Sequence, residues 1–375
     1  MKILIINWQD IKNPFGGGAE VHLHQIFSRI VKMGNEVTLF CCEIENMPKN
    51  EVIDGINVIR HGNRNTFNFG VKKYYLENFA DENFDIVIDD VNKIPFYTKD
   101  FVKKPLMGIS HHFFGTSIFK EVNPIAALYV YLSEFVMKYK YKNIPFSVVS
   151  ESTLDEFKHK NYDTSNFKII YNAIDQSKFD FEVKKKEDIL TITYFGRLKK
   201  YKSVQHLLIA YSLIKDKLPN SQIYIIGKGD YSNKLKELAI ELNIEKNVNF
   251  WGFVDEETKI DLLSRSHIAV NTSIKEGWGI TNIETNACGT PVISADSPGL
   301  RDSVKVGESG YLYKYGDTQE LSQIILRVLK NNDERIKLSE GALQWAKNFS
   351  WDKSAQQMLD YIKFVIDLYK NNKIT

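Results

Sequence analysis

Several features are scarce in this chain of 375 residues, and each absence excludes a class of protein. The three cysteines, Cys41, Cys42 and Cys288, form neither a disulfide framework nor a metal-binding spacing. No segment reaches the roughly 18 uninterrupted apolar residues of a transmembrane helix, and the first residues lack the pattern of a secretory signal. The formal net charge is only +2, so nothing demands a nucleic-acid partner. We therefore expect a soluble protein of the reducing cytoplasm.

The length favours two domains, because one ordinary hydrophobic core does not grow to 375 residues. Apolar segments that read as strands alternate with helical segments in both halves, which predicts the α/β class with parallel sheets. In the first half we expect strands at 3–7, 36–42, 56–60, 84–89, 105–110 and 145–150, with helices near 70–80, 94–102 and 118–142. A charged segment without periodicity, near 176–188, reads as the interdomain linker. These patterns predict two Rossmann-like domains.

A loop with three consecutive glycines, Gly16 to Gly18, follows the first predicted strand and precedes a helix. Strand, glycine loop and helix is the order of a phosphate-binding turn. The third glycine of a dinucleotide fingerprint is missing, since Val21 occupies that place, and this weakens a nicotinamide dehydrogenase. A plain strand-to-helix turn is the alternative interpretation.

Two histidines, His111 and His112, follow the strand predicted at 105–110. Ligands of open parallel sheets lie beyond the carboxyl ends of the strands, so either ring is well placed for function. Either ring could equally be a structural hydrogen-bonding group, and spacing does not decide which of the two faces a site.

Two cations of the second half, Arg197 and Lys202, lie five positions apart after the strand ILTITYF. A guanidinium fork and an ammonium group at this spacing could bracket a diphosphate across a strand-to-helix turn. An exposed basic loop is the alternative. Gly227 ends the next predicted strand and opens a second glycine turn without a third glycine.

The stretch from Asn271 to Asp302 places two acids, Glu276 and Glu284, eight positions apart. Thr281 with Glu284 three residues later is a capping-box pattern, so we expect Thr281 to be the N-cap of a helix ending near Cys288. Gly289 suits the left-handed residue after that helix. The free amides at its start would attract an anion. A capped surface helix with a solvated Glu276 is the alternative.

The run from Glu276 to Glu284, followed by ACGTPVIS and SPGLRD, resembles the E-x7-E region of the retaining glycosyltransferases of family 4, which have the GT-B fold. The resemblance implies two Rossmann-like lobes facing a central cleft, with the C-terminal helix returning to the first lobe. It places an acceptor-binding domain at 1–178, completed by 353–375, and a donor-binding domain at 179–352.

The resemblance also implies roles for single residues. His111, Arg197, Lys202 and Glu276 are the catalytic set. Donor binding is expected at Gly17, Gly18, Gly196, Gly227, Phe253, Val254, Gly277, Trp278, Gly279, Ile280, Thr281 and Glu284. Two positions depart from the family pattern, because Ala173 and Ser203 stand where relatives usually have glycine.

The chemistry expected from this resemblance is hexosyl transfer, with retention, from a UDP- or GDP-sugar to a glycan, lipid-linked or small-molecule acceptor. No Asp-x-Asp pair occurs in the chain, so we expect neither an essential metal nor a cofactor. A sugar-nucleotide epimerase of the same fold and a noncatalytic nucleotide-sugar-binding protein are the alternatives.

The segment 118–142 has an apolar, aromatic body that ends in Lys138, Lys140 and Lys142. An apolar run of this length belongs to a helix of the domain core or to one that lies in a membrane interface. Both interpretations stay open, and the second would add peripheral contact with the inner face of the membrane.

Overall fold

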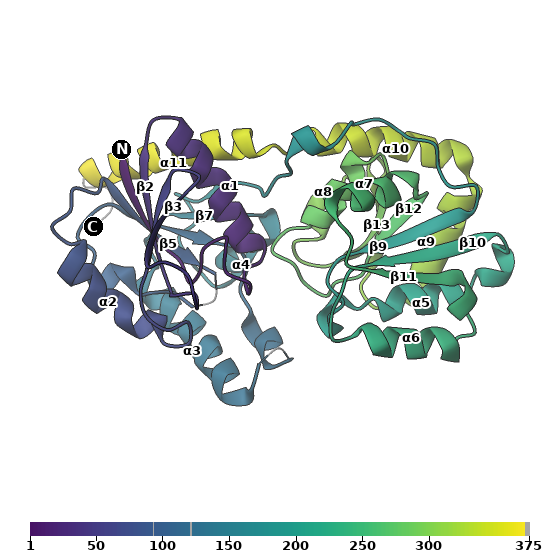
Figure 1. The fold of residues 1–375 in the computed structure, drawn as a ribbon, viewed down its shortest axis with the longest axis horizontal. Coiled ribbons are helices and arrows are strands. Elements are labelled where there is room, and N and C mark those ends of the chain that lie inside the picture. The colour runs from purple at the N-terminus through teal and green to yellow at the C-terminus, as the bar shows by residue number, and fades with distance from the viewer. Residues whose placement is uncertain (93, 121, 372–375) are drawn as a thin grey trace. The chain divides into compact units, whose positions relative to one another are not determined.

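The computed structural model describes residues 1–92, 94–120 and 122–371, and it divides into two compact units. The first unit contains Met1–Asn172 and the C-terminal segment from Trp351, and the second contains Ala173–Ser350. The chain therefore changes unit at 172/173 and 350/351, where the sequence placed the changes at 178/179 and 352/353. Figure 1 shows the sheet and the surrounding helices of each unit.

The sheet of the first unit has the strand order β3-β4-β2-β1-β5-β6-β7-β8, and all neighbours are parallel except β3 and β4. Its strands are β1 (Lys2–Ile6), β2 (Glu36–Cys41), β3 (Asn50–Ile53), β4 (Ile56–Arg60), β5 (Ile86–Val91), β6 (Leu106–Ser110), β7 (Phe146–Val148) and β8 (Lys168–Ile169). The central strands β5 and β6 are buried along their whole length, as expected for a parallel sheet with helices on both faces.

The β3–β4 hairpin was not predicted, although its signal is present in the sequence. Asp54 and Gly55 join the two strands with φ angles of 47° and 85°. Two left-handed residues in succession make the two-residue turn whose twist matches that of a hairpin, and Asp-Gly is among the pairs that adopt it most readily.

Among the described residues of this unit, the α-helices that accompany the sheet are α1 (Gly18–Lys32), α2 (Phe67–Asn78), α3 (Pro124–Lys140), α4 (Glu151–His159) and α11 (Trp351–Lys370). The C-terminal helix α11 packs against α1, where the Arg29 Nε donates to the Asp352 Oδ1 at 2.6 Å. The predicted return of the last helix to the first lobe is thereby confirmed. The helix predicted at 94–102 is wrong: Tyr97 has a φ of 54°, a left-handed conformation that a helix cannot continue through, and only a short 3-10 turn, Thr98–Asp100, forms.

The sheet of the second unit is entirely parallel, with the order β11-β10-β9-β12-β13-β14. Its strands are β9 (Leu190–Phe195), β10 (Ser221–Ile226), β11 (Val248–Gly252), β12 (Ile268–Asn271), β13 (Val292–Asp296) and β14 (Gly310–Lys314). Its helices are α5 (Gln205–Ser212), α6 (Ser232–Glu241), α7 (Glu256–Arg265), α8 (Ile280–Ala287), α9 (Thr318–Lys330) and α10 (Asn332–Ala346). The two Rossmann-like lobes expected from the sequence are confirmed.

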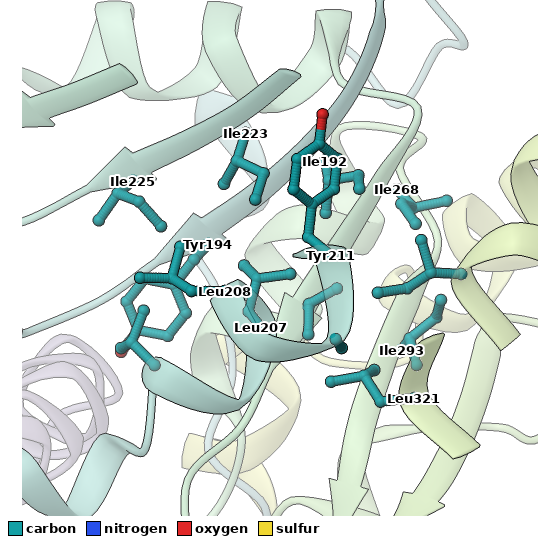
Figure 2. Packing of buried hydrophobic residues seen from close by; sticks show 14 of the residues in the cluster. Ile192, Tyr194, Leu207, Leu208, Tyr211, Ile223, Ile225, Ile268, Ile293 and Leu321 are labelled. Carbon is teal, nitrogen blue, oxygen red and sulfur yellow. The ribbon is translucent and has the colours of Figure 1, made fainter. Parts of the chain in front are cut away.

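A large apolar cluster forms most of the core of the second unit (Figure 2), and a smaller one contains Tyr224, Ile226 and Leu262. Ile192, Ile223 and Ile268 come from three neighbouring strands and are fully buried. Leu207 and Leu321, from α5 and α9, cover them and are also fully buried. Because strand and helix residues share this cluster, the loops at the ends of the strands start from a rigid base.

Three of these loops meet backbone to backbone at the carboxyl edge of the sheet. The Gly196 amide donates to the Ile226 carbonyl at 3.0 Å, and the Gly227 amide donates to the Gly252 carbonyl at 2.7 Å. A Cβ atom on Gly227 would lie 1.9 Å from the Gly196 carbonyl oxygen, and its φ of 136° is rarely adopted by other residues. Packing alone therefore requires glycine at position 227.

This contact generates a prediction about stability. Gly227→Ala should lower the free energy of unfolding by about 3 kcal/mol or more, because it adds a backbone clash to a strained φ angle. Gly307→Ala is the matched control: Gly307 has a φ of 79°, but no atom lies within 4 Å of its Cβ position, so only about 1–2 kcal/mol should be lost. Denaturant unfolding of both variants measures the difference. Equal losses of unfolding free energy in the two variants would show that the close contact between these loops contributes nothing to stability.

Candidate active site

The order of the strands in the second sheet reverses between β9 and β12. The chain builds outward from β9 to β10 and β11, and then returns to the other side of β9 with β12, β13 and β14. The two loops that leave β9 and β12 diverge at this point, which is where open parallel sheets bind their ligands. The first loop carries Arg197 and Lys202, and the second carries Glu276.

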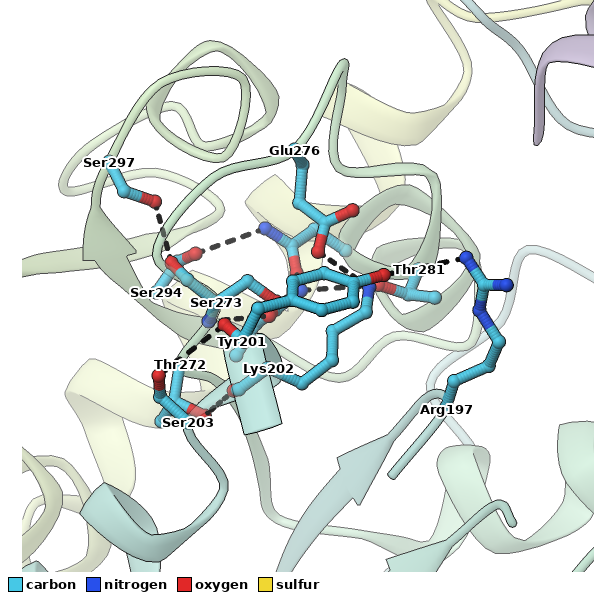
Figure 3. Close-up of polar contacts among 12 residues, drawn as sticks. Arg197, Tyr201, Lys202, Ser203, Thr272, Ser273, Glu276, Thr281, Ser294 and Ser297 are labelled. Carbon is cyan, nitrogen blue, oxygen red and sulfur yellow. Dashed lines mark hydrogen bonds and ion pairs between the residues drawn. The ribbon is translucent and has the colours of Figure 1, made fainter. Parts of the chain in front are cut away.

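Lys202 and Glu276 form an ion pair across this point (Figure 3). The Lys202 Nζ lies 2.5 Å from the Glu276 Oε1, and the two side chains are only 12% and 18% exposed. The Lys202 carbonyl also accepts a hydrogen bond from the Thr272 Oγ1 at 2.7 Å. The second loop thus positions both the backbone and the side chain of Lys202.

Arg197 belongs to the same turn as Lys202, and Tyr201 lies between them in sequence. The Arg197 Nη2 donates to the Tyr201 hydroxyl at 3.4 Å, and the Lys202 Nζ lies 5.4 Å from the centre of the Tyr201 ring. One aromatic side chain therefore contacts both cations (Figure 3). Tyr201 was not singled out from the sequence, although it stands between the two predicted cations.

The turn Gly277-Trp278-Gly279 is in close contact with the segment that follows β13. The Glu276 amide donates to the Pro298 carbonyl at 3.0 Å. A Cβ atom at Gly279 would lie 2.3 Å from the Ser303 Oγ, so only glycine fits there. The Trp278 ring is buried and packs edge-on against Phe349, with 4.9 Å between the ring centres. Donor contact by Trp278 would therefore come from its backbone.

The predicted N-cap of α8 is wrong. The helix begins at Ile280 and its N-cap is Gly279, which has no side chain to cap with. The Thr281 Oγ1 instead accepts from the Asn271 Nδ2 at 3.2 Å, because the Asn271 side chain reaches the helix start from the end of β12. The predicted end is correct: Cys288 is the C-cap and Gly289 has a φ of 68°.

Glu284 is therefore released from the capping role that the sequence pattern assigned to it. Its Oε1 accepts from the Lys259 Nζ at 2.9 Å, and Lys259 also donates to the Glu256 Oε1 at 2.9 Å. Burial raises the pKa of Glu284, and the positive charge of Lys259 opposes this rise. Lys259 itself is buried, which lowers its pKa, but the two glutamates more than reverse that effect. Nothing in the sequence pointed to Lys259.

A cavity of about 300 Å³ lies beside the glycine turns of β10 and β11. Gly227, Lys228, Phe250 and Gly252 are among the residues that line it. Phe253 follows at once, is 74% exposed, and has the Lys228 Nζ 5.6 Å from its ring centre. Val254 packs beside the buried residues Tyr224 and Ile226. The segment with the expected donor-binding residues Phe253 and Val254 therefore adjoins an open, partly basic hollow.

In the first unit, Glu20 organises the glycine loop. Its Oε2 accepts from the Gly17 amide at 2.6 Å, and its Oε1 accepts from the Gln9 Nε2 at 3.2 Å and from the Asn92 Nδ2 at 2.7 Å. The carboxylate thus joins the loop to the ends of β1 and β5. No described atom lies within 4 Å of a Cβ built on Gly18, so packing does not explain the glycine there.

His111 is buried at the end of β6, and its Nε2 lies 3.2 Å from the Asp90 Oδ1. Its ring meets the His22 ring edge-on, with 5.2 Å between the centres. Burial, together with the nearby His111, lowers the pKa of His22 to about 3, so His22 stays neutral. His112 is less buried, and its ring contacts Phe114. Asp90 thus fixes His111, an arrangement that spacing alone could not predict.

The predicted residues fall into two groups, one in each unit. Arg197, Lys202, Glu276 and Thr281 gather around the strand-order reversal of the second unit (Figure 3). In the first unit, Gly17 and Gly18 lie at the start of α1, and His111 follows the end of β6. Among the described residues no cluster of three or more His, Cys, Asp or Glu side chains has the geometry of a metal site.

Each half of the chain is similar to a family of glycosyltransferases. Residues 175–345 match the family described as Glycosyl transferases group 1, and residues 16–178 match Glycosyltransferase Family 4. A glycosyltransferase of uncharacterised role from Methanocaldococcus jannaschii is 25% identical over 98% of this chain and 99% of its own length. A D-inositol 3-phosphate glycosyltransferase from Corynebacterium urealyticum is 30% identical over 45% of this chain and 42% of its own length.

Solved structures agree on the architecture. Sucrose-phosphate synthase from Thermosynechococcus elongatus superimposes with a TM-score of 0.78 at 18% identity, covering 98% of this chain and 99% of that one. The Anabaena HepE protein in complex with UDP superimposes with a TM-score of 0.72 at 19% identity, covering 97% of this chain and all of that one. These neighbours are GT-B glycosyltransferases, and the predicted GT-B fold is thereby confirmed.

Proposed function

We propose that this chain, which is a glycosyltransferase with the GT-B fold, transfers a hexosyl group with retention from a UDP- or GDP-sugar to a glycan, lipid-linked or small-molecule acceptor. The observation that carries this proposal is the Lys202–Glu276 pair at the strand-order reversal, with Arg197 on the same turn. A diphosphate is bound by a cation, and the hydroxyl groups of a sugar are bound by a hydrogen-bond acceptor. Lys202 and Glu276 supply these two groups side by side.

Donor binding would exchange the partners of this ion pair. The β-phosphate of the donor replaces Glu276 as the partner of Lys202, while Arg197 binds a second phosphate oxygen as a fork. Glu276 then accepts hydrogen bonds from the hydroxyl groups of the sugar. The empty site keeps both charges paired, so binding exposes no bare buried charge.

The reaction breaks the bond between the anomeric carbon and the β-phosphate oxygen, and its electron pair stays on the phosphate. The acceptor hydroxyl attacks the same face of the sugar, and its proton passes to the departing phosphate oxygen. The charge that develops on the phosphate is the main barrier, so fixed positive groups there lower it most. Arg197, Lys202 and the start of α8 at Ile280 are these groups.

The remaining residues position the two substrates. Glu284, held by the buried Lys259, accepts hydrogen bonds from the ribose hydroxyls. The backbone of Phe253 and Val254 meets the base, beside the cavity at Gly252. His111, fixed by Asp90, orients the transferred sugar, and the open surface of Gly17 and Gly18 leaves room for close approach by a ligand.

The relatives support this substrate class. HepE has been solved with UDP-glucose bound, and a poly(glycerol-phosphate) alpha-glucosyltransferase of Bacillus subtilis is 24% identical over 56% of this chain. UDP-glucose is therefore the first donor to try, with other UDP- and GDP-sugars as the panel. Among the described residues no helix is long and apolar enough to cross a membrane.

The first prediction for this function concerns the metal. The enzyme should release UDP or GDP from one nucleotide sugar in excess EDTA at close to its untreated rate, because cationic side chains replace the metal. A coupled assay of nucleoside diphosphate release measures this rate, and NMR of the product should show the anomeric configuration of the donor. Complete loss in EDTA with recovery in manganese would contradict metal independence. An inverted product would contradict retention.

The second prediction concerns the two cations. Arg197→Ala and Lys202→Ala should each lower kcat by about a hundredfold or more, the scale of losing one stabiliser of transition-state charge. Lys199→Ala is the matched control, since Lys199 lies on the same turn but pairs with the exposed Asp230, so its kcat should be nearly unchanged. If all three variants behave alike, the turn is only an exposed basic loop.

The third prediction separates packing from ligand approach at the glycine loop. Gly18→Ala should leave the free energy of unfolding unchanged or raise it by up to about 1 kcal/mol, because its Cβ meets open space. The same variant should lower kcat/KM at least tenfold, since the methyl group occupies ligand space. Gly70→Ala, at a helical glycine that also faces open space, is the control for both measurements. Full activity in Gly18→Ala would show that the loop is only a tight strand-to-helix turn.

A further inference from the structure

The helix α3 exposes an unbroken apolar stripe, which we call the α3 face: Ile125, Leu128, Leu132, Phe135, Val136 and Tyr139. Every one of these side chains is at least 39% exposed, and Ile125 reaches 85%. They recur three or four residues apart, so they share one side of the helix. A surface helix of a water-soluble domain normally places such a stripe against the core.

The opposite side of α3 is buried, and it carries the polar residues Ser133 and Glu134 beside the apolar Ala127 and Met137. The two carboxylate oxygens of Glu134 accept from the backbone amides of Phe114 and Gly115 at 2.5 and 3.0 Å. Ser133 is buried beside it. These hydrogen bonds fix the rotation of the helix, because turning it would leave a buried carboxylate and two amides without partners. The outward orientation of the apolar stripe is therefore built into the fold.

The apolar surface continues onto the neighbouring segments. Phe69 of α2 is 69% exposed and lies 6.1 Å from the Tyr129 ring, measured between ring centres. The Asn68 Nδ2 donates to the Tyr129 hydroxyl at 2.7 Å, which ties α2 to α3. Phe119, before α3, is 45% exposed and pairs with Tyr131. Contiguous apolar surface of this extent marks a site of interaction with a protein or a membrane.

The charges around this surface indicate which kind of partner binds to it. Glu134 is the one acidic residue of α3, and it points inward. Lys140 and Lys142 are exposed at the end of α3, where Lys140 pairs with Asp100, and Lys72 and Lys73 are exposed on α2 next to Phe69, where Lys73 pairs with Glu77. The border therefore keeps an excess of positive charge. An apolar aromatic face with a basic border is complementary to an anionic lipid surface, where tyrosine rings also prefer to lie.

We propose that the α3 face binds an anionic membrane and that the acceptor is linked to a lipid of that membrane. This inference rests on the proposed function for the identity of the acceptor. Glu134 connects the α3 face to the loop directly after His111, so a bound membrane would lie one short loop from the residue that orients the sugar. Three lysines, Lys138, Lys140 and Lys142, add an electrostatic attraction that salt weakens.

The test is cosedimentation of the full chain with vesicles of phosphatidylcholine alone or mixed with phosphatidylglycerol. We expect binding to the mixed vesicles at low salt, with a partition coefficient that falls at high salt. Leu128→Gln/Leu132→Gln/Phe135→Gln should reduce this coefficient at least tenfold. Replacing the three lysines by Gln should reduce it by about fivefold per lysine, the equivalent of roughly 1 kcal/mol each. Leu213→Gln/Ile240→Gln/Ile336→Gln, at exposed apolar residues of the second unit, is the matched control and should bind normally.

Sedimentation velocity and donor turnover distinguish the alternatives. If the wild-type protein does not bind the mixed vesicles at low salt, the proposal is overturned. If the wild type is then a dimer and the α3 triple variant is a monomer, a second copy of the chain occupies the α3 face. Turnover of donor without vesicles should be equal in wild type and the α3 triple variant, because no altered residue belongs to the site. Vesicle binding without turnover of any donor would instead refute the proposed function and leave the membrane interaction standing.

Discussion

The ion pair between Lys202 and Glu276 is the contact on which the proposed site depends. It joins the loops after β9 and β12, the two neighbouring strands between which the strand order reverses. Beside this ion pair the loops share a backbone hydrogen bond, from the Ile274 amide to the Tyr201 carbonyl at 3.1 Å, and the contact of Thr272 with the Lys202 carbonyl. Removing either partner would leave a mostly buried charge uncompensated, which costs far more than an exposed pair contributes. In the function we propose, a diphosphate would replace Glu276 as the partner of Lys202, so the ammonium group would keep a negative partner when the donor binds.

The structural reason for a glycine differs from one position of this chain to another. At Gly227 and Gly279 a neighbouring atom occupies the position of a Cβ, and the glycine is needed whether or not a ligand binds. At Gly18 that position is open, and no structural requirement explains the residue. A sequence shows all three simply as glycines in loops near strand ends. Only the positions of neighbouring atoms separate the glycines that packing requires from the one whose Cβ position is open.

The sequence predicted the parts of the structure that depend on local pattern. Buried strands, their alternation with helices, and the ends of α8 at Cys288 and Gly289 follow from apolar runs and turn residues within a short window. The predicted start of α8 was wrong because Asn271, ten positions before Thr281, binds the threonine hydroxyl through a tertiary contact. Lys259 and Asp90 were missed for the same reason, since each meets its partner more than twenty positions away. Residue type and spacing identified candidates for binding, whereas the partners that orient them come from the fold.

The orientation of α3 shows how a buried polar contact determines what a helix exposes. The sequence favoured core packing of this segment over a membrane interface, although both need an apolar helix of this length. Glu134 determines which side of the helix is exposed, because its two hydrogen bonds to the chain after His111 require that its own side face inward. The apolar stripe that would otherwise complete a core is then left outside. A water-soluble protein gains nothing from burying a carboxylate while it exposes Ile125 and Phe135, since desolvation of the acid and hydration of the apolar side chains both oppose that arrangement. The cost is recovered only if something apolar covers the stripe, and the same carboxylate connects that covering surface to the strand end that carries His111.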